Sequence, residues 1–161
     1  MEPTIDEVRA ILANSPCVAV LGISDDPSKP AHYVPAYLHQ AGYTVVGVNP
    51  KLAGQIMFGG PVYADLAALT ASPEMERTSE RSERGPVDLL DVFRRPELLP
   101  GHLAEILALR PAVVWFQQGI RNDAVAATLR SAGITVVQDR CTLADHRRFG
   151  LEAPIGAAIS V

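Results

Sequence analysis

The sequence predicts an α/β fold built on a mainly parallel sheet of five strands, with helices on both faces. Three observations support this fold: five short apolar runs, helical spacing in the segments between them, and 12 Gly and 13 Pro residues that suit short connections. The apolar runs have almost no polar alternation, which is typical of strands buried on both faces. Alternating strands and helices predict right-handed crossovers, and therefore a single doubly wound, Rossmann-like domain over residues 1–161.

The elements follow one another in a regular order along the chain. The first predicted helix, 4–15, begins at Thr4, which is spaced from Glu7 as in a capping box. The helices after the second and fourth strands begin at an Asp and an Asn, both common N-cap residues. The predicted strands are 17–23, 44–48, 87–93, 112–116 and 134–138, and the helices between them are 32–42, 65–71, 96–110 and 122–133.

Two segments depart from this alternation. Residues 72–86 hold seven charged residues and one apolar residue, so they have nothing to bury and predict a charged, flexible surface loop. A phosphorylation or docking role for this loop and a merely solvated loop are both open. The apolar C-terminal tail, 151–161, is expected either to pack back on the domain or to cover a partner subunit in a homodimer.

Composition excludes several classes of protein. The 161 residues are 48% hydrophobic with a net charge of −4, which is typical of a soluble globular domain and unlike a general nucleic-acid binder. The apolar runs are far shorter than the ~20 residues of a membrane-spanning helix, and the acidic N-terminus is unlike a signal peptide, so we expect a cytoplasmic protein without a membrane partner. Cys17 and Cys141 are too far apart for a CxxC motif, and the four histidines lack metal-ligand spacing, so no metal site is predicted.

The residues that follow the predicted strands are rich in cations. Ligands of open α/β sheets bind in the crevice beyond the carboxyl ends of the strands, where these five loops should converge. Cations gathered at one edge of a net-acidic protein indicate an anionic ligand, with scattered surface charge as the alternative. Eight of the 14 basic side chains lie in these loops: Lys29, Lys51, Arg94, Arg95, Arg121, Arg140, Arg147 and Arg148.

The first of these loops is suited to phosphate but matches no standard nucleotide motif. Gly22 follows the strand directly, and a helix is expected to begin near Ala31 or His32, where free backbone N–H groups could meet phosphate oxygens. The loop lacks the second and third glycines of GxGxxG and is not a P-loop. Asn49 stands where a typical NAD site has an acidic residue that holds the ribose hydroxyls, which disfavours NAD.

Five motifs together carry a resemblance over about residues 16–150. They are VAVLGIS, YLHQAGYTVVGVNPKLAGQ, VDLLDVFRRPE, VVWFQQGIRND and VVQDRCTLADHRR. In this order they resemble the small stand-alone coenzyme A-binding family of Rossmann-like proteins, related in fold to the CoA-binding domain of the succinyl-CoA synthetase α subunit. The resemblance implies a non-covalent site for coenzyme A, or an acyl-CoA, in the strand-end crevice.

The resemblance also implies which residues form the first half of this site. Gly22 and Ser24 would shape the first loop, and Lys29 matches the family's basic position facing the phosphates. Asn49 and Pro50 match its Asn-Pro after the second strand, with Lys51 next to them. Two acidic residues, 25 and 26, depart from what a phosphate-facing loop would be expected to contain.

The second half of the implied site follows the last three strands. Phe93, Arg94 and Arg95 match the segment that flanks the nucleotide, and Gln117 and Asn122 match polar positions around the pantetheine path. A final pair, Arg140 and Cys141, matches the Arg-Cys after the last strand. The thiol of Cys141 could form a mixed disulfide with the cofactor, or the side chain could be a packed small hydrophobe.

No catalytic set can be assembled from the sequence. No GxSxG frame is present, and Asp88 and Asp91 are three residues apart on one strand, so they face opposite sides of the sheet. His146 is expected to be structural. The leading prediction is therefore a CoA-binding carrier, sensor or accessory protein. The alternatives are an NAD- or other nucleotide-dependent enzyme and a ligand-free interaction module.

Overall fold

The computed structural model, which describes residues 1–76 and 86–156, contains a five-stranded sheet in which every neighbouring pair is parallel. The strand order is β2-β1-β5-β6-β7. This confirms the predicted doubly wound, Rossmann-like fold, and the strands are up to three residues shorter than predicted. They are β1 (Cys17–Leu21), β2 (Thr44–Val48), β5 (Leu89–Val92), β6 (Val113–Phe116) and β7 (Thr135–Val137).

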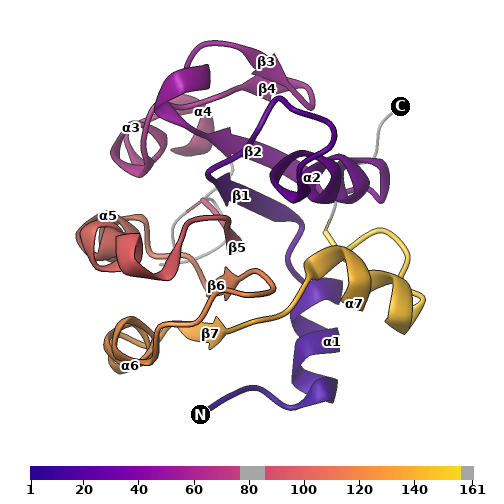
Figure 1. Ribbon diagram of the computed structural model, residues 1–161. Helices are drawn as coiled ribbons and strands as arrows, with labels where there is room; N and C mark the ends of the chain where they lie inside the picture. The colour runs from indigo at the N-terminus through magenta and orange to yellow at the C-terminus, as the bar shows by residue number, and fades with distance from the viewer. Residues whose placement is uncertain (77–85, 157–161) are drawn as a thin grey trace.

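Helices cover both faces of the sheet (Figure 1). One face carries α1 (Ile5–Ala13), α2 (Pro30–Gln40) and α7 (Thr142–Phe149), and α7 packs against both α1 and α2. The other face carries α3 (Leu66–Thr70), α5 (Leu103–Leu109) and α6 (Asp123–Ser131). Strand β1 lies between β2 and β5, and the chain leaves β1 and β5 toward opposite faces. The carboxyl ends of β1 and β5 are therefore the topological switch point where such sheets bind ligands.

Each face has its own apolar core. The β-strand residues alternate between the two cores, so Trp115 and Phe116, both fully buried, belong to opposite faces. The α1–α2–α7 face also buries Val8, Leu12, Val34 and Leu38, and the α3–α5–α6 face buries Leu66, Leu69, Leu99, Ile106 and Leu129.

Several elements of the structure were absent from the sequence prediction. Residues 142–149, predicted as part of a loop, form α7, so Arg147 and Arg148 lie on a helix. Strands β3 (Ile56–Met57) and β4 (Gly60–Pro61) form a small antiparallel hairpin after the short 3-10 helix η1 (Pro50–Leu52). Strands β3 and β4 have two residues each, and the buried residues of α7 are polar, so apolar periodicity did not reveal them.

The ends and the connecting segments refine the other predictions. The predicted capping box of α1 is present. The predicted helix 96–110 is a 3-10 helix, η2 (Pro96–His102), followed by α5, because Pro100 and Gly101 interrupt regular α-helix. Within the predicted loop 72–86, residues Pro73–Glu76 form α4, and 77–85 lie outside the described residues.

The C-terminal tail contacts the body of the structure through Pro154 and the backbone of Ile155. Pro154 is buried, and the N–H of Ile155 donates to the carbonyl of Ala13 at 2.8 Å. Residues 157–161 of the tail lie outside the described residues. No helix among the described residues has both the length and the hydropathy needed to cross a bilayer.

Candidate binding site at the strand ends

The floor of the candidate site is a close contact between the ends of β1 and β5. Gly22 has a φ of +88°, and its N–H donates to the carbonyl of Val48 at 2.9 Å. A Cβ atom at this position would lie 2.6 Å from the carbonyl oxygen of Phe93, so only glycine fits without displacing the backbone. The N–H of Phe93 in turn donates to the carbonyl of Leu21 at 2.9 Å. The loops that follow β1 and β5 therefore start from one fixed point.

The loop after β1 is folded on itself by its own side chains. The hydroxyl of Ser24 accepts from the N–H of Asp26 at 3.0 Å. The carboxylate of Asp26 accepts from both the N–H and the hydroxyl of Ser28, and these hydrogen bonds lower its pKa. The acidic side chain of Asp26 is therefore engaged within the loop. Lys29 is left exposed at the N-cap of α2, and no described carboxylate lies within ion-pair distance of its ammonium.

Asn49 joins the end of β2 to this loop. Its Nδ2 donates to the carbonyl of Ile23 at 2.8 Å, and its Oδ1 accepts from the N–H of Lys51 at 2.9 Å. Both polar atoms of the Asn49 side chain therefore hold the loops together. The position carries no carboxylate of the kind that binds the ribose hydroxyls in NAD sites. Pro50 and Lys51 are exposed on η1 beside the strand ends.

The segment after β5 places two guanidinium groups at the carboxyl edge of the sheet. Arg94 is half-buried, and its Nε donates to Nε2 of His102 at 3.4 Å. Arg95 has a side chain that is 77% exposed, with only a long contact of 3.6 Å to the carboxylate of Glu97. Phe93 packs its ring against the apolar core on the α1–α2–α7 face. Arg95 is therefore the guanidinium of this segment that is most available to a ligand.

Gln117 is part of a buried polar network. Its Nε2 donates to Oδ1 of Asp91 at 2.6 Å and to the hydroxyl of Thr142 at 2.9 Å. That hydroxyl donates to Oδ2 of Asp91 at 3.0 Å. Burial raises the pKa of Asp91 to about 7, against the opposing effect of the two hydrogen bonds. Gln117 was among the predicted site residues, whereas Asp91 and Thr142 were not, although an aspartate inside the apolar run LLDVF was the available signal.

Asn122 lies at the start of α6 and acts as its N-cap. Its Oδ1 accepts from the N–H of Val125 at 3.1 Å, and its Nδ2 donates to the carbonyl of Pro96 at 3.2 Å. The side chain therefore ties α6 to η2, and a direct role toward a ligand would require these bonds to be exchanged.

The segment after β7 is fixed by Arg140. Its guanidinium donates to both carboxylate oxygens of Asp145, at 2.7 and 2.9 Å, and this pairing raises the pKa of Arg140. The indole Nε1 of Trp115 donates to the backbone carbonyl of Arg140 at 2.8 Å. Cys141 is a half-buried free thiol at the N-cap of α7. Arg140 is thus held by two short bonds to a buried carboxylate, whereas Arg95 has one exposed ion pair at 3.6 Å and Lys29 has no ion pair with a described carboxylate.

The remaining cations of the predicted set lie in different surroundings. Lys51 and Arg148 are exposed. Arg121 pairs with Glu2 and Asp123, and the guanidinium of Arg147 lies 5.0 Å from the centre of the Tyr37 ring. The structure therefore leaves fewer cations available at the strand ends than the sequence count of eight.

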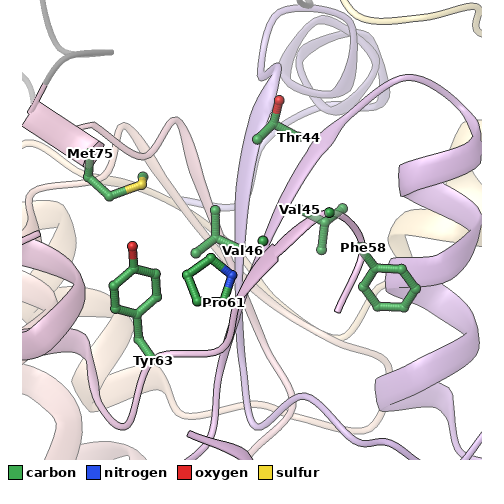
Figure 2. Close-up of a pocket in the computed structure, with 9 residues that line it drawn as sticks. Thr44, Val45, Val46, Phe58, Pro61, Tyr63 and Met75 are labelled. Atoms are coloured by element: carbon green, nitrogen blue, oxygen red, sulfur yellow. The ribbon is translucent and has the colours of Figure 1, made fainter. Parts of the chain in front are cut away.

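Other candidate sites are less suited to an anion. A cavity of about 140 Å³ lies between the β3–β4 hairpin and the first residues of β2 (Figure 2), and apolar groups dominate its lining. It contains no charged side chain, and its residues are Thr44, Val45, Val46, Phe58, Gly59, Gly60, Pro61, Tyr63 and Met75.

No group of three or more metal-ligating side chains occurs in residues 1–76 and 86–156. His146 is buried, with Nδ1 hydrogen-bonded to the hydroxyl of Tyr37 at 2.7 Å, which fits its predicted structural role.

Two known proteins are similar to this chain over most of its length. The uncharacterized protein YneT of Bacillus subtilis (strain 168) is 33% identical over 144 residues, which cover 89% of this chain and 95% of that protein. A solved Thermus thermophilus structure, cell-free ID.343, is 45% identical with a TM-score of 0.77, covering 91% of this chain and 98% of that one.

Further structural neighbours share the fold. A Pyrococcus horikoshii OT3 protein is 27% identical with a TM-score of 0.75, covering 91% of this chain and 92% of that one. The dinucleotide-forming acetyl-coenzyme A synthetase 1 of Ca. Korarchaeum cryptofilum is 20% identical with a TM-score of 0.56; the match covers 78% of this chain and 26% of the synthetase, so it shows the fold alone. The model of the CoA binding domain family matches residues 17–147, and the chain therefore belongs to that family.

Proposed function

We propose that this protein binds coenzyme A or an acyl-CoA non-covalently in the crevice at the carboxyl ends of β1 and β5. The observation that carries the proposal is a pair of exposed cations on the two loops that start at the Gly22–Phe93 contact: Lys29, and Arg95 with its exposed ion pair to Glu97. Membership of the CoA binding domain family supports the choice of ligand.

The chemistry of the ligand fits these groups. Coenzyme A carries about four negative charges on its phosphates, and lysine or arginine at the rim of a crevice can form charge-assisted hydrogen bonds to them. In this proposal Lys29, Arg94 and Arg95 contact phosphates, while Gly22, Ser24 and Asn49 hold the loop geometry. Pro50 and Lys51 border the site on η1. Arg140, with its guanidinium paired to Asp145, positions the backbone beside Cys141.

The proposed activity is binding, as a carrier, a sensor or an accessory protein. Gln117 and Asn122, which the resemblance places along the pantetheine path, act in this proposal through the elements that they join. The pantetheine arm, which is uncharged, would lie on the side of the crevice toward the start of α7, where Arg140 offers no unpaired charge.

Calorimetric titration with coenzyme A, acetyl-CoA, 3′-dephospho-CoA, NAD and ATP tests the proposal. We expect coenzyme A and acetyl-CoA to bind, 3′-dephospho-CoA to bind more weakly, and NAD and ATP to bind least. Heat from NAD or ATP alone would instead favour a nucleotide-dependent enzyme. Absence of heat with every ligand would favour an interaction module.

Replacing Lys29 tests the phosphate contact within the same assay. Lys29→Ala is expected to weaken coenzyme A binding about tenfold, because one charge-assisted hydrogen bond is lost, and to reduce the dependence of affinity on salt. Arg9→Ala is the matched control, since Arg9 is an exposed cation on α1. Equal affinities in the wild type and the Lys29→Ala variant would show that Lys29 does not meet the phosphates.

A further inference from the structure

The central strand β5 carries a titratable group in its fully buried interior. Asp91 has no exposed surface, and its neighbours along the strand, Leu90 and Val92, are equally buried and apolar. Burying a carboxyl group without a cationic partner is costly, and apolar packing would avoid that cost. Among the described residues, the donors that reach its oxygens are neutral: the amide of Gln117 and the hydroxyl of Thr142. A group of this kind needs an explanation beyond the stability of the core.

The network holds the start of α7. Thr142 is the first residue of this helix, and the preceding N-cap residue, Cys141, makes no side-chain capping bond. Two other contacts hold the helix start instead. The hydroxyl of Thr142 donates to Asp91 in the sheet, and Arg140, just before the helix, pairs with Asp145 in its first turn. The N–H of Asp145 donates to the carbonyl of Cys141 at 2.9 Å. Through Thr142, Asp91 therefore attaches the start of α7 to the middle of the sheet.

This attachment lies directly below the candidate site. In the strand register Asp91 stands beside Val20 of β1 and Trp115 of β6. The next two residues along β1 are Leu21 and Gly22, where the first loop begins. Helices α2 and α7 follow the parallel strands β1 and β7, so both begin at the carboxyl edge of the sheet, and on the same face α7 packs against α2 (Figure 1).

We propose that Asp91 is a positioning residue of the strand-end site, which acts through Thr142 and Gln117 to hold the start of α7 and Cys141 at the crevice. This inference rests on the proposed binding of coenzyme A and assigns to the buried network a role in that binding. Its chemistry is purely one of hydrogen bonding: the carboxyl group accepts from two donors, one just after β6 and one on α7, and so joins three elements.

Two substitutions test the inference, with two controls. Thr142→Val removes the hydroxyl at nearly constant shape. Asp91→Asn, measured above the Asp91 pKa of about 7 where the carboxyl group is ionised, leaves one of the two donors without an acceptor. Thr142→Ser retains the hydroxyl and should restore the wild-type result. Asp88→Asn changes a carboxylate just before the start of β5, where Asp88 Oδ2 accepts from the N–H of Cys17 at 2.9 Å.

The first readout is the affinity for coenzyme A, measured by calorimetry on protein shown to be folded. We expect Thr142→Val and Asp91→Asn to weaken binding about tenfold, whereas Thr142→Ser and Asp88→Asn bind as the wild type does. The second readout is amide hydrogen exchange at Asp145 and His146. Exchange there should accelerate about tenfold in Thr142→Val and remain unchanged in Asp88→Asn.

The outcomes separate the two proposals. A wild type that does not bind coenzyme A contradicts the proposed function. A wild type that binds, together with Thr142→Val and Asp91→Asn proteins that bind equally well, contradicts only the positioning role. Faster exchange in α7 with unchanged affinity also overturns the inference, because the network would then serve stability alone.

Discussion

Replacing Gly22 with alanine is expected to lower the free energy of unfolding by about 2–5 kcal/mol, from left-handed strain and overpacking together. The Cβ would lie 2.6 Å from the carbonyl oxygen of Phe93 and 3.2 Å from Cδ of Arg94, at a φ of +88°. Because the neighbour is backbone, the ends of β1 and β5 must separate to relieve the contact. The melting temperature should fall by about 5–15 °C, as measured by calorimetry.

Gly54→Ala provides the matched control for this experiment. Gly54 has a nearly identical φ of +87°, but a Cβ there would meet no atom within 4 Å. Its substitution should cost only about 1–2 kcal/mol, from the left-handed conformation alone. The difference between the two variants measures the contact with Phe93. Equal losses of stability would show that the ends of β1 and β5 do not meet closely at Gly22.

The second large effect is a dependence of stability on pH that originates in Asp91. Burial raises the pKa of this carboxyl from 3.8 to about 7 in the folded protein. Between these two values the folded state retains a proton that the unfolded chain has lost. The contribution of Asp91 to stability is therefore fully present below about pH 4 and is lost as the pH rises through 7.

Urea unfolding of the wild type and of Asp91→Asn measures this effect. Between about pH 5 and about pH 8 the wild type should lose roughly 2–3 kcal/mol relative to the variant, because the amide that replaces the carboxyl group does not titrate. Other carboxyl groups are the same in both proteins and cancel in the difference. A difference in unfolding free energy that stays constant with pH would show that Asp91 is ionised at pH 5 in the folded state, as it is in the unfolded chain.

The strands were predictable because a run of consecutive apolar residues indicates a strand that is buried on both faces. Runs such as TVVGV have no polar alternation, and β2 has the predicted bounds. Helix α7 was not predictable in the same way, because its buried face includes Thr142, Asp145 and His146, whose burial depends on partners elsewhere. Polar residues that are buried by tertiary contacts leave no apolar period in the sequence.

The residues of the candidate site also differ in how far the local sequence could identify them. Gly22 and Lys29 were recognisable from their positions after the first strand, and the structure gives each a local reason, a close backbone contact and an exposed N-cap. The network of Asp91, Gln117 and Thr142 joins residues 26 and 51 positions apart. Sequence alone also placed Arg140 among the available cations, because its partner Asp145 lies on a helix that was not predicted.

The most direct test of the central claim is to map the coenzyme A contacts by NMR in isotopically labelled protein. The proposed site predicts that amide shifts on titration concentrate at Gly22, Ser24, Lys29 and Arg94, which border the ends of β1 and β5. Residues of the apolar cavity beside β2, such as Thr44 and Phe58, should remain unchanged. Shifts concentrated at that cavity, with none at the strand ends, would contradict the proposed site.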